Sequence, residues 1–401
     1  MSSSLQPSPG ILAINAGSSS IKFGLFETTP QLRRLMEGQI ERIGLSGTQL
    51  SMTDVMSSRT EHVAIQRGDH AACIRPLMDR IEQRVSASAL LAVGHRIVHG
   101  GMKYSQPELV SPAVMAELRR ISPYDPEHMP AEIGLMEAFR QRYPGLPHVA
   151  CFDTAFHCAM LRVARLLAIP RRYDKLGIQR YGFHGLSYAF LMKELASIGK
   201  QGEAEGRVIL AHLGNGASMT AVLGGKSIET TMGFTPTSGL PMSRRSGDLD
   251  PGLMSYLTRT EGLTVEQFHQ MANSESGLLG VSESSADMRD LLALEANDRR
   301  AAEAVALFCY QAKKAIGALA AVLGGVDSLV FSAGIGEHSP VVRARICEGL
   351  GFLGITIDDA RNEANDAVIS RGYGQVTVRV IHTDEECEIA QAMLSLLAAT
   401  R

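Results

Sequence analysis

Polar side chains gather near the start of the chain, where two apolar runs are separated by a turn of small residues. The stretch 11–26 reads ILAINAGSSSIKFGLF and carries Asn15, Ser18, Ser20 and Lys22. Small residues in a turn let the backbone approach a ligand closely, and serine hydroxyls with free N–H groups suit phosphate oxygens. The pattern predicts either a phosphate-binding hairpin or a plain hairpin turn.

Three further polar residues stand beside small residues or strand ends. Arg96 precedes Gly100 and Gly101, where its planar fork suits a carboxylate, a phosphate or an ion pair. Asp153 follows the apolar run 148–152, so it lies either at the functional edge of an α/β sheet or at a helix N-cap. His184 stands in RYGFHG at 180–185, and this pattern predicts either a pocket wall or a packed histidine.

A second hairpin pattern occurs about half a chain later. Residues 209–223 read ILAHLGNGASMTAVL, and a displacement of 198 positions aligns ILA with ILA and Ser20 with Ser218. Two similar hairpins at this distance indicate a duplicated domain or a chance similarity. The duplication would give each half its own phosphate-binding turn.

A long loop at 233–252 carries Arg244 and Arg245 among glycines and prolines. Long irregular segments in compact domains are often functional, so the loop is a candidate anion clamp, with a solvated charged loop as the alternative. The sequence lacks a complete P-loop, a dinucleotide-binding fingerprint and a G-x-S-x-G elbow. Those three classes of site are therefore not predicted.

These residues need strands and helices to position them, and hydrophobic periodicity predicts both. Helices are expected at 71–86, 131–139, 187–198, 299–323 and 386–399, and strands at 90–98, 148–152, 326–331 and 376–381. The glycine-rich segment 333–337 is expected to be a turn that leads into a helix beginning at Ser339 and Pro340. Such a turn suits an adenosine or simply joins a strand to a helix.

Length and composition indicate a globular enzyme with two domains. The chain has 401 residues, of which 45% are hydrophobic, and a net charge of −3 without any basic run. Nucleic acid and membranes are therefore not expected as partners. The six cysteines have no CxxC spacing and are expected to be free thiols. No apolar run approaches the roughly 20 residues of a membrane span, and a cytoplasmic location is expected.

Taken together, the sequence resembles the acetate kinase family along nearly its whole length. The matching blocks follow the family's order: NAGSSSIK at 15–22, GHRIVHGG at 94–101, FDTAFH at 152–157, RYGFHG at 180–185, HLGNGAS at 212–218, RSGDLDPG at 245–252, AGIGEH at 333–338 and TDEE at 383–386. The resemblance implies reversible phosphoryl transfer from ATP to acetate, or alternatively to propionate.

The resemblance also implies an α/β fold: the duplicated, actin-like, ribonuclease H-like fold of two domains with the nucleotide between them. The first domain is expected at 1–153 with 385–401, and the second at 154–384. Mg²⁺, with Mn²⁺ as an alternative, is the implied cofactor, and Asn15 and Glu385 match its partners. Hard oxygen ligands are the ones Mg²⁺ prefers. A homodimer is implied as well.

Site residues follow from the same motifs. Arg96 matches the arginine that holds the substrate carboxylate, Asp153 the catalytic aspartate, and His184 and Arg245 the groups that stabilise the transferring phosphoryl group. Val98, Phe183 and Pro236 match the apolar acyl pocket. The residues that match the nucleotide site are Lys22, Ser18, Ser20, His212, Leu213, Gly214, Asn215, Gly216, Asp287, Met288, Arg289, Gly334, Ile335, Gly336, Glu337 and His338.

Two departures from the family pattern concern specificity. His338 stands where the family often has Asn, at the adenosine end. His128 is the best counterpart of a catalytic histidine in an L-H-N-P context, but it lies in PEHMP, so Glu127 or Tyr124 replaces a leucine of the acyl pocket. Acyl-chain preference is the property these changes affect.

Two other classes share this fold. A non-catalytic ATP-dependent switch has no reason to carry the set Arg96, His184 and Arg245. A sugar kinase needs an aspartate base and a polar pocket. A carboxylate needs no deprotonation to act as a nucleophile, so Asp153 is expected to order water or an arginine and not to serve as a general base.

Overall fold

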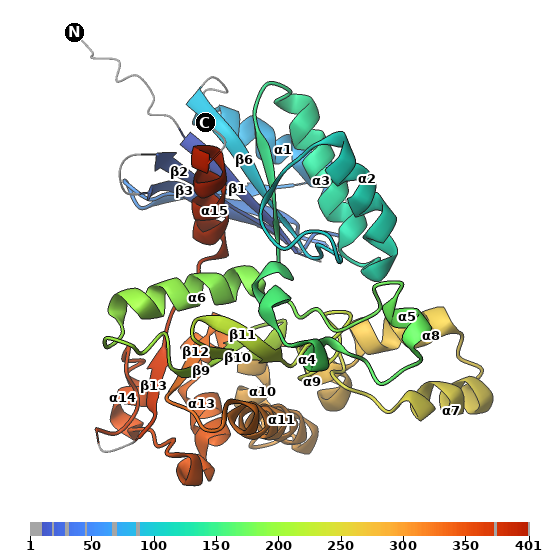
Figure 1. The fold of residues 1–401 in the computed structure, drawn as a ribbon, viewed down its shortest axis with the longest axis vertical. Coiled ribbons are helices and arrows are strands. Elements are labelled where there is room, and N and C mark those ends of the chain that lie inside the picture. The colour runs from blue at the N-terminus through green and yellow to red at the C-terminus, as the bar shows by residue number, and fades with distance from the viewer. Residues whose placement is uncertain are drawn as a thin grey trace. The chain divides into compact units, whose positions relative to one another are not determined.

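The computed structural model describes residues 10–17, 20–28, 32–44, 46–65, 70–85, 89–372 and 375–399. Two compact units make up the chain (Figure 1): unit 1 is Met1–Ala155 with Asp384–Arg401, and unit 2 is Phe156–Thr383. The boundaries expected from the sequence, after 153 and after 384, differ from these by two residues and one residue. The predicted nucleotide contact Ser18 lies outside the described residues.

Unit 1 is built on an eight-stranded sheet with the order β5-β4-β3-β2-β1-β6-β8-β7. Its strands are β1 (Gly10–Ala16), β2 (Ile21–Thr28), β3 (Leu32–Glu41), β4 (Gln49–Asp54), β5 (Arg59–Ala64), β6 (Leu90–Ile97), β7 (Glu108–Leu109) and β8 (His148–Phe152). Its helices are α1 (His70–Glu82), α2 (Pro112–Ile121), α3 (Met129–Arg142) and α15 (Glu385–Ala399).

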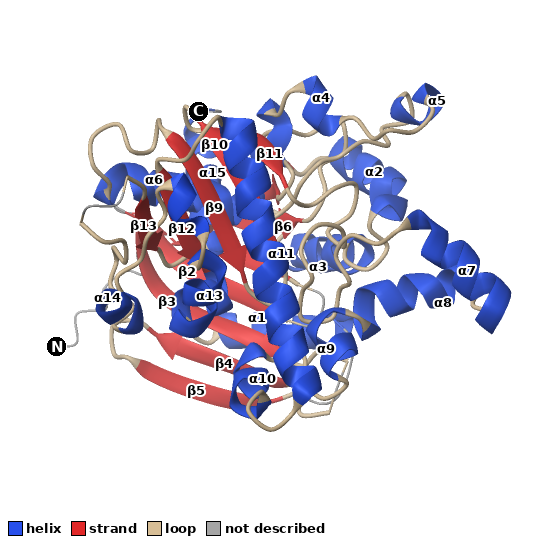
Figure 2. Cartoon of the chain, turned by 90° about the horizontal axis from the view of Figure 1, so that it is seen from below, coloured by secondary structure: helices blue, strands red, loops and turns tan. Residues whose placement is uncertain are grey.

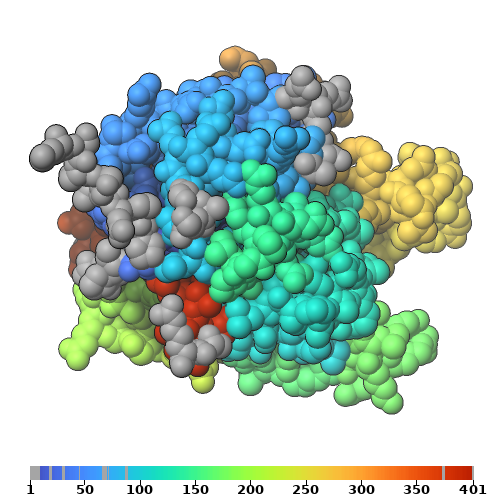
Figure 3. Space-filling model, turned by 90° about the horizontal axis from the view of Figure 1, so that it is seen from above, coloured from blue at the N-terminus to red at the C-terminus, as the bar shows by residue number. Residues whose placement is uncertain are grey.

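Helices cover both faces of the sheet of unit 1. Leu12 and Ile14 of β1 pack with Leu77 of α1 and Phe139 of α3 in one core. On the other face, α15 packs against β1, β2 and β6, and a Cβ on Gly94 would lie only 2.6 Å from the side chain of Ile389. Figure 3 shows α15, in red, reaching the surface among the segments of unit 1.

Unit 2 is built on a five-stranded sheet with the order β11-β10-β9-β12-β13. Its strands are β9 (Arg207–Leu213), β10 (Ala217–Leu223), β11 (Lys226–Thr230), β12 (Ser328–Ser332) and β13 (Thr377–Val380). Its helices are α4 (Arg162–Arg165), α5 (Arg171–Asp174), α6 (Gly185–Ile198), α7 (Pro251–Glu261), α8 (Val265–Gln270), α9 (Gly277–Ser282), α10 (Met288–Leu294), α11 (Arg299–Leu323), α12 (Ala333–His338), α13 (Pro340–Cys347) and α14 (Asp359–Glu363).

The long helix α11 runs along the sheet of unit 2 (Figure 2) and contacts β9 and β10. Phe308 and Ile316 are buried on its inner face, while Leu191 and Leu195 of α6 belong to a core with Val330 of β12. By length and composition alone α11 is long and apolar enough to cross a membrane, although Lys313 and Lys314 interrupt its apolar residues. Core helices pass the same test, so this is a weak indication.

The two sheets share one topology. In unit 1, β1 pairs with β2 and β2 with β3 antiparallel, while β1 and β6 and then β6 and β8 pair parallel. In unit 2, β9, β10, β11, β12 and β13 repeat this order and these directions. The predicted α/β fold class and its internal duplication are confirmed.

The two hairpin turns of the repeat differ in length. Ala16 pairs with Ile21 in unit 1, whereas Leu213 pairs with Ala217 in unit 2. Four residues therefore separate the paired positions in the first hairpin and three in the second. A constant displacement of 198 positions cannot align both strands of the hairpins, so Ser20 and Ser218 are not equivalent positions.

Candidate functional site

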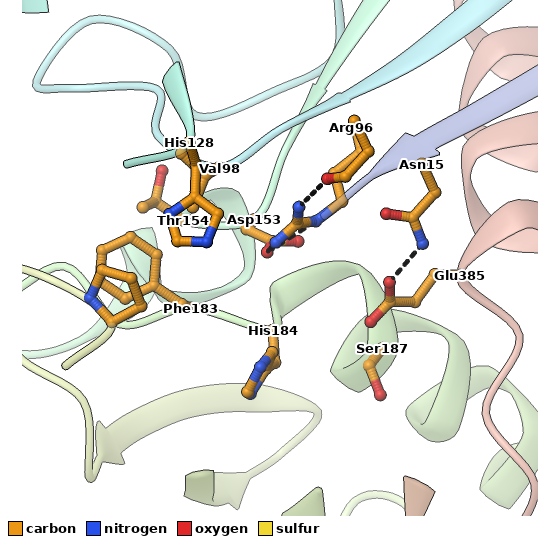
Figure 4. A network of polar contacts seen from close by, with 12 residues as sticks. Asn15, Arg96, Val98, His128, Asp153, Thr154, Phe183, His184, Ser187 and Glu385 are labelled. Atoms are coloured by element: carbon orange, nitrogen blue, oxygen red, sulfur yellow. Dashed lines mark hydrogen bonds and ion pairs between the residues drawn. The ribbon is translucent and has the colours of Figure 1, made fainter. Parts of the chain in front are cut away.

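The partly buried Arg96 and the buried Asp153 form an ion pair at neighbouring strand ends of unit 1 (Figure 4). Arg96 lies in β6 and donates from Nε at 3.0 Å and from Nη2 at 2.6 Å to Oδ2 of Asp153, which follows β8. Nη1 donates to the carbonyl of Ala16 at the end of β1 at 2.6 Å. Three adjacent parallel strands thus bring these groups together. Asp153 pairs with an arginine and does not cap a helix.

Glu132 is a third member of this cluster, and no motif predicted it. One carboxylate oxygen accepts from Nη1 of Arg96 at 3.1 Å and the other accepts from the backbone N–H of Val98 at 2.8 Å. Burial raises the pKa of Glu132 to about 8, although the charge of Arg96 opposes the rise. The sequence feature that could have indicated Glu132 is an acidic residue among the apolar residues of α3.

Asn15 and the beginning of α15 form a second polar cluster in unit 1. Nδ2 of Asn15 donates to Glu385 at 2.7 Å and to Glu386 at 2.8 Å. Burial raises the pKa of both carboxyl groups; Asp153 adds to the rise for Glu385, and Glu385 adds to it for Glu386. Lys22, which pairs with Asn15 across the hairpin, opposes the rise in both. This cluster carries excess negative charge that a cation would relieve.

The donor set of this cluster suits a divalent cation. Within the described ranges, no group of three or more His, Cys, Asp and Glu side chains is arranged as a metal site. Mg²⁺, however, commonly uses one or two protein carboxylates and keeps several waters. Oδ1 of Asp153 is buried and has no hydrogen-bond partner among the described residues. Asn15, Glu385 and Asp153 thus carry the kind of oxygen atoms that Mg²⁺ prefers.

His128 lies at the N-cap of α3 and is held by a residue that the sequence did not single out. Its Nδ1 lies 2.9 and 3.0 Å from the two carboxylate oxygens of Asp125, which also accepts its backbone N–H at 3.2 Å. Both side chains are buried. A carboxylate on one ring nitrogen fixes the orientation of an imidazole. The signal for this pair was an acidic residue three positions before the histidine in a proline-rich segment.

In unit 2, His184 is held in a sparsely populated backbone conformation. It is the N-cap of α6 with φ +58°, in the left-handed region. Its Nδ1 lies 2.8 Å from the hydroxyl of Ser218, and its ring stacks on that of His212 with centroids 4.1 Å apart. A non-glycine residue with positive φ beside a stacked second imidazole is typical of a functional site.

Arg245 and His184 converge on the backbone of Gly216. A Cβ at position 216 would lie 3.0 Å from Nε2 of His184 and 3.7 Å from Nη1 of Arg245. Nη1 of Arg245 also donates to the carbonyl of Pro236 at 3.3 Å. Gly216 therefore leaves space beside both groups, as a phosphate-binding turn requires.

The loop that carries Arg245 is fixed by its neighbours. Gly277 has φ +63°, and a Cβ there would lie 2.1 Å from the carbonyl oxygen of Met242 and 2.7 Å from that of Arg245. Asn215 of the second hairpin turn accepts from the Ser243 hydroxyl at 3.2 Å. The alternative of an unconstrained solvated loop is therefore wrong, because the loop packs against the hairpin turn and α9.

The predicted adenosine residues fall into two separate groups. Asp287 caps α10 through the N–H of Arg289, and the two side chains also form an ion pair at 2.6 Å. Residues 333–338 form the helix α12 and not a turn, which corrects the prediction. Ala333 opens this helix with φ +63°, and its N–H donates to Glu337 at 2.6 Å.

The Glu337 carboxylate has internal partners: it binds the N–H groups of Ala333 and Thr383 and lies 2.6 Å from Nδ1 of His382. His338, in contrast, is largely exposed. Behind the helix, the fully buried Arg343 donates to the carbonyls of Gly336 and Glu337, both at 2.9 Å. No motif predicted Arg343, which fixes the end of α12.

The three predicted acyl-pocket residues belong to different units. Val98 lies in unit 1, where Glu132 holds its N–H. Phe183 and Pro236 lie in unit 2, where the Phe183 carbonyl faces Nε2 of His157 at 3.0 Å. Their role in a common pocket stays a prediction.

The chemistry of the two clusters defines a class. Unit 1 offers a carboxylate-paired arginine and hard oxygen ligands, and unit 2 offers an arginine and an imidazole beside a glycine turn. Such groups neutralise the charge of phosphoryl groups, as in phosphotransferases.

Comparisons with known proteins give the family. The Acetokinase family profile matches residues 10–391, and the chain belongs to this family. It is 43% identical over 386 residues to an acetate kinase of Rhodopseudomonas palustris, covering 95% of this chain and 96% of the relative. It is 41% identical over 396 residues to a propionate kinase of Citrobacter rodentium, covering 97% of both. The crystal structure of Porphyromonas gingivalis acetate kinase superposes with a TM-score of 0.87 at 35% identity, covering 97% of this chain and all of that one.

Proposed function

We propose that the protein is a carboxylate kinase that transfers the γ-phosphoryl group of ATP reversibly to acetate, giving acetyl phosphate and ADP. The family membership supports this activity. The geometric observation that carries it is the approach of His184 Nε2 and Arg245 Nη1 to one glycine backbone, at 3.0 and 3.7 Å from the Cβ position of Gly216. Two such donors suit the equatorial oxygens of a transferring phosphoryl group.

The transfer is a direct in-line displacement. A carboxylate oxygen of acetate forms a bond to the γ-phosphorus while the bond from that phosphorus to the leaving oxygen of ADP breaks. Arg96 binds the acetate carboxylate, and His184 and Arg245 donate to the phosphoryl oxygens. Acetate enters as an anion, so no proton has to be removed. Asp153 therefore orients Arg96, which it binds at 2.6 and 3.0 Å, and is not a general base.

Asn15 and Glu385 are the residues proposed to hold Mg²⁺, and Asp153, whose Oδ1 has no hydrogen-bond partner among the described residues, would order its waters. Mn²⁺ suits the same oxygen ligands. When bound, the cation would supply positive charge that offsets the negative charge of the phosphoryl groups. The raised pKa values of Glu385 and Glu386 support the assignment, because neighbouring carboxylates withdrawn from solvent favour a cation.

The nucleotide is proposed to contact the hairpin residues Lys22, Ser18 and Ser20, the second turn and the adenosine residues. The second turn and the adenosine group comprise His212, Leu213, Gly214, Asn215, Gly216, Asp287, Met288, Arg289, Gly334, Ile335, Gly336, Glu337 and His338. Met288, Leu213 and Glu337 are buried, so their contribution is through the backbone. His128, oriented by Asp125, is proposed to act beside the acyl group.

Propionate is the second candidate acceptor. The propionate kinase relative supports it. PEHMP, which puts Glu127 or Tyr124 at the position of an apolar pocket residue, alters the acyl pocket but favours neither acid. Val98, Phe183 and Pro236 are proposed to line the acyl pocket in either case. A cytoplasmic homodimer is proposed from the family resemblance.

An acyl hydroxamate assay with ATP and Mg²⁺ tests these proposals. The purified full chain is given acetate, propionate or butyrate, and hydroxylamine traps any acyl phosphate. The highest kcat/KM is expected with acetate. A higher value with propionate would make the protein a propionate kinase, and no hydroxamate with any acid would refute the kinase function.

A further inference from the structure

A chain of two hydroxyl groups leads from the core of unit 2 to His184. The hydroxyl of Tyr188 lies 2.5 Å from Oγ of Ser218, and the same Oγ lies 2.8 Å from Nδ1 of His184. Tyr188 and Ser218 are both fully buried. A buried polar chain of this kind must satisfy each hydrogen, so the direction of its hydrogen bonds is restricted.

The secondary structure fixes this chain. Tyr188 follows His184 by one helical turn in α6, and its backbone N–H donates to the His184 carbonyl at 3.0 Å. Ser218 lies in β10, where it pairs with His212 of β9. His184 is thus held from two sides. The first turn of α6 fixes its backbone, and Ser218 of β10 fixes its ring.

The chemistry of the hydroxyl groups sets the direction of the hydrogen bonds. A phenol, with a pKa near 10, is a stronger donor than the hydroxyl of serine. Tyr188 therefore donates to Ser218. Ser218 has a single hydroxyl hydrogen and directs it at Nδ1 of His184, which becomes an acceptor. The proton of a neutral His184 ring then resides on Nε2, the nitrogen that faces the Gly216 turn.

We propose that Tyr188 and Ser218 are positioning residues that hold His184 in the Nε2–H tautomer, so that the neutral ring donates a hydrogen bond toward the Gly216 turn. The acceptor of that bond in turnover is an oxygen of the transferring phosphoryl group, which rests on the proposed function; the tautomer itself does not. A neutral donor also places no positive charge against the stacked ring of His212, whose centroid lies 4.1 Å away.

His212 provides an internal comparison within unit 2. Its Nδ1 lies 2.8 Å from Oγ of Ser187, and that oxygen lies 2.7 Å from Oγ1 of Thr383. This second chain has two aliphatic hydroxyl groups and no phenol, so donor strength does not set its direction. Ser187→Ala therefore removes the hydroxyl that contacts His212, the ring stacked on His184. It leaves the hydrogen bonds from Tyr188 through Ser218 to His184 in place.

The test is nitrogen-15 NMR of the histidine rings in the full-length protein without substrates. His184→Asn assigns the His184 signals. Wild-type His184 is expected as the Nε2–H tautomer. Tyr188→Phe and Ser218→Ala are expected to increase its Nδ1–H fraction and leave His212 unchanged, whereas Ser187→Ala affects His212 alone. Nδ1–H in wild-type His184, or an unchanged tautomer in Tyr188→Phe, would overturn the proposal.

Kinetics separate positioning from general structural damage. Tyr188→Phe keeps the ring and is expected to lower kcat about 10-fold, with the KM values of both substrates within about twofold of wild type. An unchanged kcat together with a changed tautomer would overturn the catalytic part of the proposal. Absence of acyl phosphate formation by the wild type would refute the kinase function instead and would leave the NMR result standing.

Discussion

Asn15 and Glu385 are 370 positions apart in the sequence, yet their side chains lie 2.7 Å apart in unit 1. The contact exists because α15, the last helix of the chain, packs against the first two strands. Glu386 of the same helix lies 2.8 Å from the same amide nitrogen. Asn15 thus connects the first hairpin to two partly buried carboxylates, and its amide oxygen is the neutral ligand of the proposed cation site.

Asn15→Ala is expected to raise the Mg²⁺ concentration for half-maximal activity by about 10-fold, while the KM for acetate changes less than about twofold. The variant loses one oxygen ligand and the amide that orients both carboxylates. Activity is titrated with Mg²⁺ at saturating ATP and acetate. Asn297→Ala, which changes an exposed asparagine of unit 2, is the control. An effect on acetate KM alone would contradict the metal assignment.

Arg245→Ala is expected to lower kcat at least about 10³-fold with the fold intact, because arginines on transferring phosphoryl groups contribute roughly 10³–10⁵ in rate. Circular dichroism and thermal unfolding check the fold. The adjacent Arg244 is exposed, and Arg244→Ala is expected to keep kcat within about threefold. A near-normal kcat of Arg245→Ala would show that Arg245 does not stabilise the transferring phosphoryl group.

Sequence patterns were sufficient to place the polar residues that lie at strand ends. Arg96 and Asp153 follow recognisable apolar runs, and parallel strands bring their carboxyl ends to one edge. The hairpin repeat likewise predicted the shared sheet topology. Ala333 was placed wrongly: glycines nearby suggested a turn, but Glu337 accepts its N–H and a six-residue helix forms. The side chain of Glu337, four positions after Ala333, thus stabilises a helix at this point of the chain.

Residues that act through other side chains could not be predicted. Glu132 and Arg343 lie in helices without motifs, and their partners come from other segments of the chain. Asp125 binds His128 only three positions away, but no motif marks this pair. Local propensity carries no information on such pairs. The link from Tyr188 to Ser218 also depends on packing of α6 against the sheet, which one sequence does not specify.

Glu132→Gln is expected to remove a pH dependence from acetate binding. The pKa of Glu132 is about 8, so the carboxyl group is mainly protonated below that pH and ionised above it. Ionisation adds a second negative charge beside Arg96, and the KM for acetate of the wild type is expected to rise between pH 7 and pH 9. In Glu132→Gln the KM is expected to vary less over that range.

The matched control for Glu132 lies on the same helix: Glu137→Gln changes a more exposed carboxylate that pairs with Arg119. Glutamine can accept only one of the two hydrogen bonds made by Glu132, so a loss of about 1–3 kcal/mol of stability is expected as well. An equal rise of KM with pH in the wild type and in Glu132→Gln would contradict the role of this carboxyl group.

Gly216→Ala is expected to lower kcat on the order of 10²-fold while the protein stays folded. The new Cβ would lie 3.0 Å from Nε2 of His184, so that ring must move by a few tenths of an ångström, whereas the 3.7 Å to Nη1 of Arg245 is an ordinary contact. Gly317→Ala is the control, because a Cβ in that part of α11 meets no atom within 4 Å. The control should gain about 0.5–1 kcal/mol of stability with unchanged kinetics. Equal kcat values for Gly216→Ala and Gly317→Ala would show that the space at Gly216 is not needed for catalysis.

His148 and His95 predict acid sensitivity in unit 1. Nε2 of His95 lies 3.0 Å from Nδ1 of His148, and both side chains are buried. Burial lowers the pKa of His148 to about 4 and the pKa of His95 well below its usual 6.5. The unfolded chain therefore binds more protons than the folded protein below pH 6.5. The free energy of unfolding must fall as the pH drops from about 6.5 to about 4.

For His148 alone, the shift of the pKa from 6.5 to about 4 corresponds to about 3 kcal/mol of stability lost across this window. Urea unfolding at several pH values measures it. His148→Gln removes one titrating ring, so its free energy of unfolding should decrease by about 3 kcal/mol less than that of the wild type over the same range. His62→Gln changes an exposed histidine of the same unit and should follow the wild type. Parallel pH curves for His148→Gln and the wild type would show that the buried pair does not govern acid stability.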